Sequence, residues 1–245
     1  MAGTARTAGT LRKWLDLCAA AAVLLVSAVF LWLQFSPSSQ RPAAQRAKRE
    51  LPPMPTRPVS IAGAPALGRV DSSVVMIEYS EMQCPFCQRF EADVWPQLKQ
   101  EFVDTGKVQA FFRHFPLESI HPKALPAATA LECASVQGRF WEMKDRLHQA
   151  PGRLDREHFL EAASALRLSP GPFSDCLDNQ GASAVKASLA ESKAAGVVST
   201  PTFLFGRRVD GGRVEVIDRV VGAQPLAAFR TAVNAVLSKI AAGSE

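Results

Sequence analysis

Two cysteines, Cys84 and Cys87, lie three positions apart in the sequence YSEMQCPFCQRF at residues 79–90. Cys84 stands at the predicted start of a helix, where unpaired backbone N–H groups and the helix dipole stabilise a thiolate. Pro85 suits the first helical position because the missing N–H is not needed there. Since the thiolate is the attacking species, a lowered pKa would make Cys84 a nucleophile near neutral pH. Cys87, one turn further along and less exposed, is suited to resolving a mixed disulfide.

Two other uses of this pair have less support. A closed zinc site needs four ligands, and the remaining cysteines and histidines do not stand at the spacing of a second ligand pair. A permanent bond between Cys84 and Cys87 would close a loop too small to restrain much chain entropy. We therefore expect a redox-active dithiol with no metal and no bound cofactor. For His114 and His121 we expect loop or capping roles.

The elements around the cysteines predict a β-α-β unit. Residues 74–79 form a short β-branched run typical of a buried central strand, and a helix is expected over 84–104, kinked at Pro96. A second strand is expected at 108–114. Further helices are predicted at 122–137, 139–149, 156–166 and 183–195, strands at 202–205 and 213–217, and a last helix from Pro225 to residue 241. This order predicts an α/β domain with a helical insertion near its middle.

The net charge of the chain is unevenly distributed. The formal charge is +5, yet residues 71–245 hold 19 Lys and Arg against 21 Asp and Glu. The basic residues therefore concentrate in the first part of the chain. Nucleic-acid binding would need a basic face on the folded domain, so we expect no nucleic-acid partner.

An uncharged apolar stretch of 19 residues occupies 17–35. As a helix it would reach about 28 Å, close to the hydrocarbon thickness of a bilayer. Its bulky C-terminal end disfavours signal cleavage, so we expect an uncleaved transmembrane anchor after an N-terminal tail at 1–16. Residues 36–70 hold seven of the 17 prolines and predict a disordered basic linker. The flanking Lys and Arg favour a cytoplasmic domain, whereas the cysteine chemistry favours the opposite side.

Four segments of the folded part occur in the same order as the motifs of a known protein family. They are YSEMQCPFC, FFRHFPL, ALECASVQGRFWEMKDRL and GVVSTPTFLFG. Together, over about residues 72–239, they resemble the membrane-anchored branch of the DsbA-like thiol:disulfide oxidoreductases. The resemblance implies a thioredoxin-like fold at 71–245 with a helical insertion at about 118–196. It also implies a periplasmic domain anchored in the cell inner membrane, cysteine-containing exported proteins as substrates, and a membrane redox partner that resets the CxxC pair.

The resemblance also assigns roles to residues near the cysteines. Pro201 occupies the family's cis-proline position, although an ordinary trans proline at a strand start is the alternative. Thr200, Pro85 and Phe86 would contact the substrate. Glu78 occupies the position of a buried carboxylate that relays the proton of the second cysteine. The alternative for Glu78 is a solvent-exposed residue at a strand edge.

Two further cysteines and one departure from the family complete the predictions. Cys133 and Cys176 fall where some relatives carry a second disulfide, and two buried free thiols are the alternative. The family's best-known oxidant has His where this chain has Phe86, so we expect a less strongly oxidising couple. The resemblance leaves open whether the enzyme is an oxidant, an isomerase or a reductant. The alternative function is a non-enzymatic polypeptide-binding module with structural or metal-bound cysteines.

Overall fold

The structure is a computed structural model that describes residues 24–32 and 51–242. The chain divides into two units, residues 1–51 and 52–245. Of the predicted anchor, residues 24–32 are helical, and the rest lies outside the described residues, as do the predicted tail and the linker up to residue 50. Within the described ranges, no helix combines the length and the apolar character needed to cross a membrane.

A six-stranded sheet forms the centre of the folded unit, in the order β1-β6-β5-β3-β4-β2. Its strands are β1 (Val59–Ser60), β2 (Ala66–Leu67), β3 (Val74–Ser80), β4 (Val108–His114), β5 (Thr202–Val209) and β6 (Arg213–Val221). β3 and β4 are parallel, as the β-α-β prediction requires, and every residue of both is buried. The β3–β5 and β5–β6 pairs are antiparallel. β5 and β6 extend beyond the predicted strands because each satisfies the backbone groups of the other.

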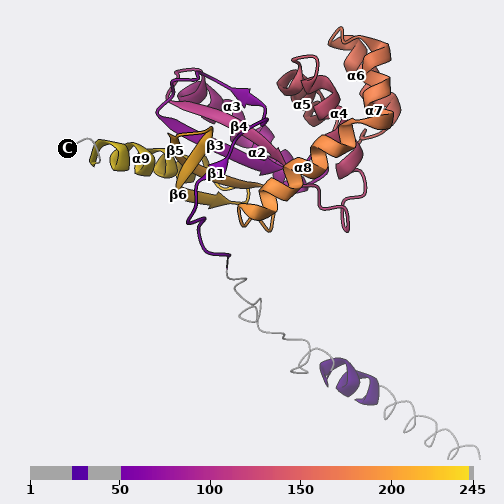
Figure 1. Ribbon diagram of the computed structural model, residues 1–245. Helices are drawn as coiled ribbons and strands as arrows, with labels where there is room; N and C mark the ends of the chain where they lie inside the picture. The colour runs from indigo at the N-terminus through magenta and orange to yellow at the C-terminus, as the bar shows by residue number, and fades with distance from the viewer. Residues whose placement is uncertain (1–23, 33–50, 243–245) are drawn as a thin grey trace, which may run out of the picture. The chain divides into compact units, whose positions relative to one another are not determined.

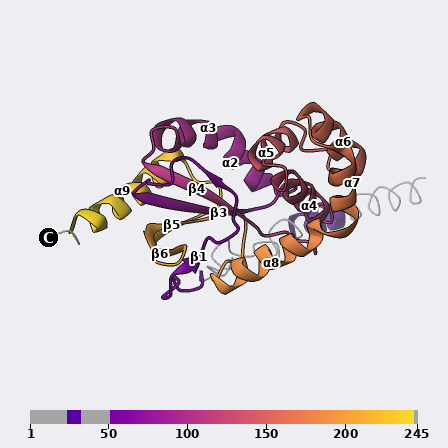
Figure 2. The same ribbon diagram turned by 45° about the horizontal axis from the view of Figure 1, so that its top comes forward.

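The first helix of the fold breaks near Pro96, as the sequence predicts. It consists of α2 (Pro85–Asp93), α3 (Trp95–Leu98) and a π-helical turn, Lys99–Val103. Together with α9 (Leu226–Ala242), α2 and α3 bury aromatic side chains against one face of the sheet, including Phe90, Trp95 and Phe229. The end of α8 (Gly181–Ala194) and the residues after it cover the other face. Figure 2 shows α2 and α3 on one side of the sheet and α8 on the other.

The residues between β4 and β5 form the predicted helical insertion. It comprises α4 (Ala124–Ser135), α5 (Phe140–Gln149), α6 (Arg156–Ala165), α7 (Pro170–Asn179) and α8. α4 to α7 gather around an apolar cluster that also includes Met82 and Phe112 of the sheet domain, and α8 returns from this group toward the sheet (Figure 1). α7 is not among the helices predicted from the sequence, because the run Pro170-Gly171-Pro172 at its start is typical of a loop. Pro170 is tolerated there because it occupies the first helical turn.

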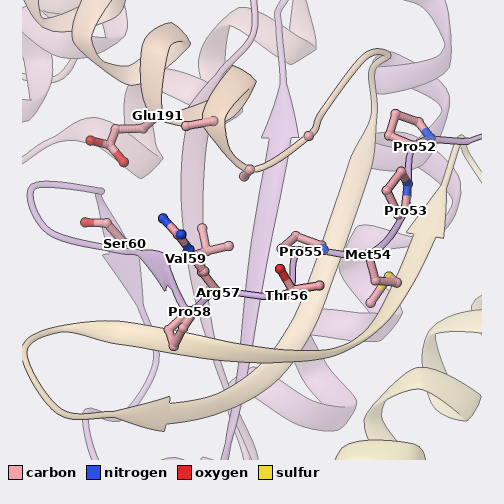
Figure 3. A pocket seen from close by; sticks show the side chains of 13 residues that line it. Pro52, Pro53, Met54, Pro55, Thr56, Arg57, Pro58, Val59, Ser60 and Glu191 are labelled. Atoms are coloured by element: carbon pink, nitrogen blue, oxygen red, sulfur yellow. The ribbon is translucent and has the colours of Figure 1, made fainter.

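The prediction of a disordered linker over 36–70 is wrong for residues 51–70. β1 pairs with β6 and β2 with β4, so both sheet edges come from this segment. Its prolines flank the short pairings, and edge strands tolerate them. Val59 and Ile61 are buried in the core, and this apolar burial anchors the segment. Figure 3 shows residues 52–60 along a pocket whose opposite wall includes Glu191 of α8.

Candidate active site

Cys84 and Cys87 lie where β3 passes through a short loop into α2. Cys84 is the N-cap residue of α2, with extended backbone angles (φ −65°, ψ 121°), and Pro85 follows in the first turn. Both cysteines are free thiols. Cys84 is 2% exposed and Cys87 is fully buried, so Cys84 is less accessible than the sequence analysis expects.

The surroundings of Cys84 favour its thiolate. Its pKa is lowered from 9.0 to about 5, chiefly by a hydrogen bond from the Cys87 thiol and against the effect of burial. The Thr200 side chain and the backbone N–H groups of Phe86 and Cys87 add to the lowering. These N–H groups are unpaired donors of the first helical turn, which stabilise a negative charge at the N-cap.

Cys87 behaves in the opposite way. Burial raises its pKa well above the usual thiol value, and the hydrogen bond to Cys84 and the negative charge of that thiolate raise it further. The Ser80 side chain and the Glu81 backbone offset part of this. Cys84 therefore ionises first, while Cys87 keeps its proton at neutral pH. This is the asymmetry expected of an attacking and a resolving thiol.

The segment before β5 lies against Cys84. The Thr200–Pro201 peptide bond is cis, as the resemblance implies. The Cys84 sulfur lies 3.7 Å from the Thr200 carbonyl oxygen. The Pro201 carbonyl accepts a hydrogen bond from the Gly222 N–H at 2.8 Å, which ties this segment to the end of β6.

Glu78 is fully buried, which excludes the solvent-exposed alternative. Burial raises its pKa to about 7, with Lys144 opposing the rise and Glu91 adding to it. Lys144 of α5 is itself fully buried. Its Nζ contacts the Glu91 carboxylate and lies 3.6 Å from Glu78 Oε2. β3, α2 and the insertion thus each contribute one ionisable side chain to a buried cluster of two carboxyl groups and one ammonium group.

The sequence analysis missed Lys144 and Glu91. Burial alone would lower the pKa of Lys144, but the two carboxylates raise it, so the ammonium persists. Three aromatic rings also lie 5.3–5.6 Å from its Nζ, those of Trp95, Phe112 and Trp141. A signal was present: Lys144 occupies a position of the apolar stripe Phe140, Met143, Leu147 on α5. A lysine in a core stripe needs a buried acidic partner.

The remaining predicted residues lie at two places. Pro85 and Phe86 are exposed at the start of α2, and the Arg89 guanidinium carbon lies 5.1 Å from the centre of the Phe86 ring. Cys133 of α4 and Cys176 of α7 form a disulfide, with an S–S distance of 2.09 Å. The bridge joins two helices of the insertion, as the resemblance implies.

Comparison with known proteins relates the chain to a family and to solved folds. A family model described as thioredoxin matches residues 61–218. The Na(+)/H(+) antiporter NhaA 3 of Salinispora tropica is 32% identical over 166 residues, 67% of this chain and 24% of that protein. The Na(+)/H(+) antiporter NhaA of Herminiimonas arsenicoxydans is 33% identical over 194 residues, 77% of this chain and 30% of that protein. The chain thus spans less than a third of the length of these relatives.

Among solved structures, DsbA-like proteins share the fold. The crystal structure of Wolbachia pipientis alpha-DsbA1 has a TM-score of 0.66 and 22% identity, covering 76% of this chain and 97% of that one. Oxidised BdbD from Bacillus subtilis has a TM-score of 0.62 and 21% identity, covering 74% of this chain and 98% of that one. At these identities the comparison establishes a shared architecture, a thioredoxin-like sheet with a helical insertion.

Proposed function

We propose, because the chain belongs to the thioredoxin family, that it is a DsbA-type thiol–disulfide oxidoreductase whose redox pair is Cys84 and Cys87. The observation that carries the proposal is the asymmetry of the two thiols. The pKa of Cys84, at the N-cap of α2, is lowered to about 5, while burial raises the pKa of Cys87. A reactive thiolate beside a protonated resolving thiol is the arrangement that stepwise disulfide exchange requires.

The reaction takes place in two exchanges. The Cys84 thiolate attacks one sulfur of a substrate disulfide, the substrate S–S bond breaks, and one substrate thiolate leaves. Cys87 then loses its proton and attacks the Cys84 sulfur of the mixed disulfide, which releases the second substrate thiolate. The pair is oxidised to a Cys84–Cys87 disulfide, and two electrons have passed to the substrate. The reverse sequence oxidises a substrate dithiol.

Glu78 is the proposed acceptor of the Cys87 proton. Its pKa, raised by burial to about 7, lets it take and return a proton near neutral pH. Ser80 lies two residues further along β3, on the same face of the strand as Glu78. Glu78, Ser80 and Cys87 are all buried, so a proton passed between these residues is shielded from bulk water.

Substrate binding is proposed at the segment around the cis bond and at the start of α2. The Thr200 carbonyl oxygen lies 3.7 Å from the Cys84 sulfur, and Pro201 follows it across the cis bond. Pro85 and Phe86 add an exposed apolar edge beside it. An extended polypeptide carrying a cysteine fits this combination of a backbone carbonyl beside the nucleophile and an exposed apolar surface.

The direction of electron flow depends on the reduction potential of the pair. Phe86 stands where a positively charged His would further stabilise the Cys84 thiolate, so we expect a couple less oxidising than one with His there. Equilibration with glutathione measures the potential. A value near −270 mV, as in thioredoxin, would make the protein a reductant, and one near −120 mV an oxidant.

Activity assays separate this function from a polypeptide-binding module. The full chain should reduce insulin disulfides or oxidise a reduced dithiol peptide, and C84S should do neither. If both forms hold unfolded polypeptide equally well and neither exchanges disulfides, the binding module is correct and the proposed enzyme is not.

We also propose that residues 17–35 anchor the chain in the cell inner membrane with the folded domain outside the cytoplasm, the position expected of the membrane-anchored branch. Exported proteins would then be the substrates, and a membrane redox partner would reset the pair. The Cys133–Cys176 disulfide supports the placement because structural disulfides persist in oxidising compartments. A reporter that is active only outside the cytoplasm, fused after Glu245, should be active. Silence of that reporter, with a cytoplasmic reporter active instead, would overturn the placement.

A further inference from the structure

The loop between β3 and Cys84 is held by the residues that precede α4. The Glu81 carboxylate accepts a hydrogen bond from the Gln83 N–H at 2.6 Å through Oε2, and its Oε1 contacts His121 Nδ1. The Gln83 side-chain oxygen accepts a hydrogen bond from the Lys123 N–H at 2.7 Å. Two side chains of the cysteine loop therefore contact the first residues of the insertion, 121–123.

Glu81 is a buried acid on the loop that carries the nucleophile. It is 1% exposed, whereas the His121 side chain keeps 16% of its surface in solvent. Burial raises the pKa of Glu81, the Gln83 N–H and His121 lower it, and the negative charge of the Cys84 thiolate raises it. The repulsion between Glu81 and Cys84 is mutual, so an ionised Glu81 opposes the ionisation of Cys84.

We propose that Glu81 and His121 are positioning residues for Cys84, in which the contact with the His121 side chain offsets the charge of the Glu81 carboxylate and thereby protects the thiolate three residues further along. The inference rests on the proposed function, because it concerns the reactivity of the same thiol. The sequence analysis expects only a loop or capping role for His121. The inference instead assigns its side chain an effect on the reactivity of Cys84.

The charges around the two groups support this assignment. The His121 side chain acts on Glu81 from the insertion and lowers its pKa, and the Cys84 thiolate acts on Glu81 from its own loop and raises it. Cys84 is also contacted by Cys87 from α2 and by Thr200 from the segment before β5, and both of these are uncharged at neutral pH. The ionised Glu81 is thus a negative charge on the loop of Cys84, and His121 is the group placed to cancel it. Without His121, an ionised Glu81 and the Cys84 thiolate would repel each other in a region of low dielectric constant.

The test is the pH dependence of Cys84 alkylation in the reduced full chain, with iodoacetamide as the probe and mass spectrometry to locate the label. E81Q keeps the side-chain volume and removes the charge, so the midpoint of Cys84 should move to lower pH. H121Q should move it to higher pH. We expect about half a pH unit each way, which is roughly a threefold change in thiolate fraction below the midpoint. H121K, which restores a positive charge without an imidazole, should return the midpoint toward that of the wild type.

Coupling between the two residues distinguishes the inference from a purely structural role. In the E81Q background, H121Q should have a smaller effect than it has alone, because there is no carboxylate left to neutralise. Equal effects of H121Q in both backgrounds, or lowered melting temperatures with unmoved midpoints, would overturn the inference. If E81Q does not fold, the test rests on H121Q and H121K, which should both fold because His121 is partly exposed. The same Cys84 alkylation midpoint in these two variants would then overturn the inference. An ordinary midpoint near 8.5 in the wild-type chain would instead contradict the proposed function.

Discussion

The two cysteine pairs in the described part of the chain lie in opposite surroundings. Cys84 and Cys87 are three positions apart at the start of α2, with backbone N–H groups and the Thr200 side chain around the first sulfur. Cys133 and Cys176 are 43 positions apart and join α4 to α7, and Cys133 lies in an apolar cluster of the insertion. One pair is a free dithiol and the other a disulfide.

The comparison shows that burial alone does not decide what a cysteine does. Cys84 and Cys133 are almost equally buried, at 2% and 1% exposed. What differs is the electrostatic environment of the sulfur and the length of chain that a bond would close. Hydrogen-bond donors at a helix N-terminus stabilise a thiolate, which is needed for attack. An apolar site between helices distant in sequence favours a bond that restricts the unfolded chain.

The largest expected effect is loss of exchange activity when Cys84 is replaced. C84S should lower the rate of disulfide exchange at least a thousand-fold, because the attacking thiolate is gone. The double variant C133A/C176A should keep the rate within roughly threefold, since effects at sites that share no partners are independent. The measurement is insulin reduction or dithiol-peptide oxidation at fixed pH.

Two controls belong to that experiment. Circular dichroism must show that C84S and C133A/C176A are folded at the assay temperature. An equal loss of activity in both variants, with both folded, would contradict the prediction that only the Cys84–Cys87 pair carries out disulfide exchange.

The second effect concerns stability, and here the roles of the pairs are reversed. A loop of 43 residues closed by a disulfide stabilises the folded state by about 4 kcal/mol on the chain-entropy model, and a three-residue loop by about 1.6 kcal/mol. C133A/C176A should therefore lower the free energy of unfolding by about 4 kcal/mol. Urea unfolding under oxidising conditions measures it.

The matched control is C84A/C87A, which removes the short pair. Its free energy of unfolding should fall by less than that of C133A/C176A, relative to the oxidised wild type. A larger loss in C84A/C87A would contradict the assignment of the insertion disulfide as the structural one.

The third prediction tests how the reactive pair completes its reaction. E78Q should slow the Cys87-dependent release of a mixed disulfide by roughly ten- to a hundred-fold, because the acceptor of the Cys87 proton is lost. Stopped-flow decay of a preformed mixed disulfide with a fluorescent peptide measures this step. The alkylation rate of Cys84 should change little.

E132Q serves as the control for a lost carboxylate elsewhere. Glu132 pairs with His114 at 2.8 Å in a contact between α4 and β4, and it has no part in the proposed reaction. Equal slowing in E78Q and E132Q would show that general destabilisation, and not proton transfer, causes the effect.

Much of the architecture could be predicted because its signals are local. The β-branched run before the cysteines, the break at Pro96 and the apolar periodicity of the insertion helices each depend on neighbouring residues. The start of α2 at Pro85 could be predicted for the same reason, and it brings the helix dipole to Cys84. Residues 51–70 could not, because two-residue edge strands leave no periodic pattern and depend on β4 and β6 for their partners.

The parts of the site that escaped prediction come from segments distant in sequence. Glu78 is predicted as a buried acid, but its cation is Lys144, on a helix of the insertion. The same holds for the contact of Glu81 with His121 across the boundary of the insertion. Each residue carries a local sign of burial or charge, but which of them meet depends on how the insertion docks on the sheet. The local patterns of a single sequence do not contain that information.

The smallest predicted effect is a pH dependence of stability that belongs to the reactive pair alone. The pKa of Cys84 is depressed from 9.0 in the unfolded chain to about 5 in the folded one. Its ionisation therefore stabilises the reduced folded state fully above about pH 9, and the contribution disappears as the pH falls toward 5. Allowing for solvent screening, we expect the difference between wild type and C84S to grow by roughly 1 to 2 kcal/mol from pH 5 to pH 8. Urea unfolding of both reduced proteins at the two pH values measures it.

C133A/C176A, compared with wild type in the oxidised state, should show a difference that does not vary with pH, because disulfide-bonded sulfurs do not titrate. If the difference for C84S is equally flat, Cys84 is no more acidic in the folded state than in the unfolded one, and the contrast between the two pairs reduces to their spacing.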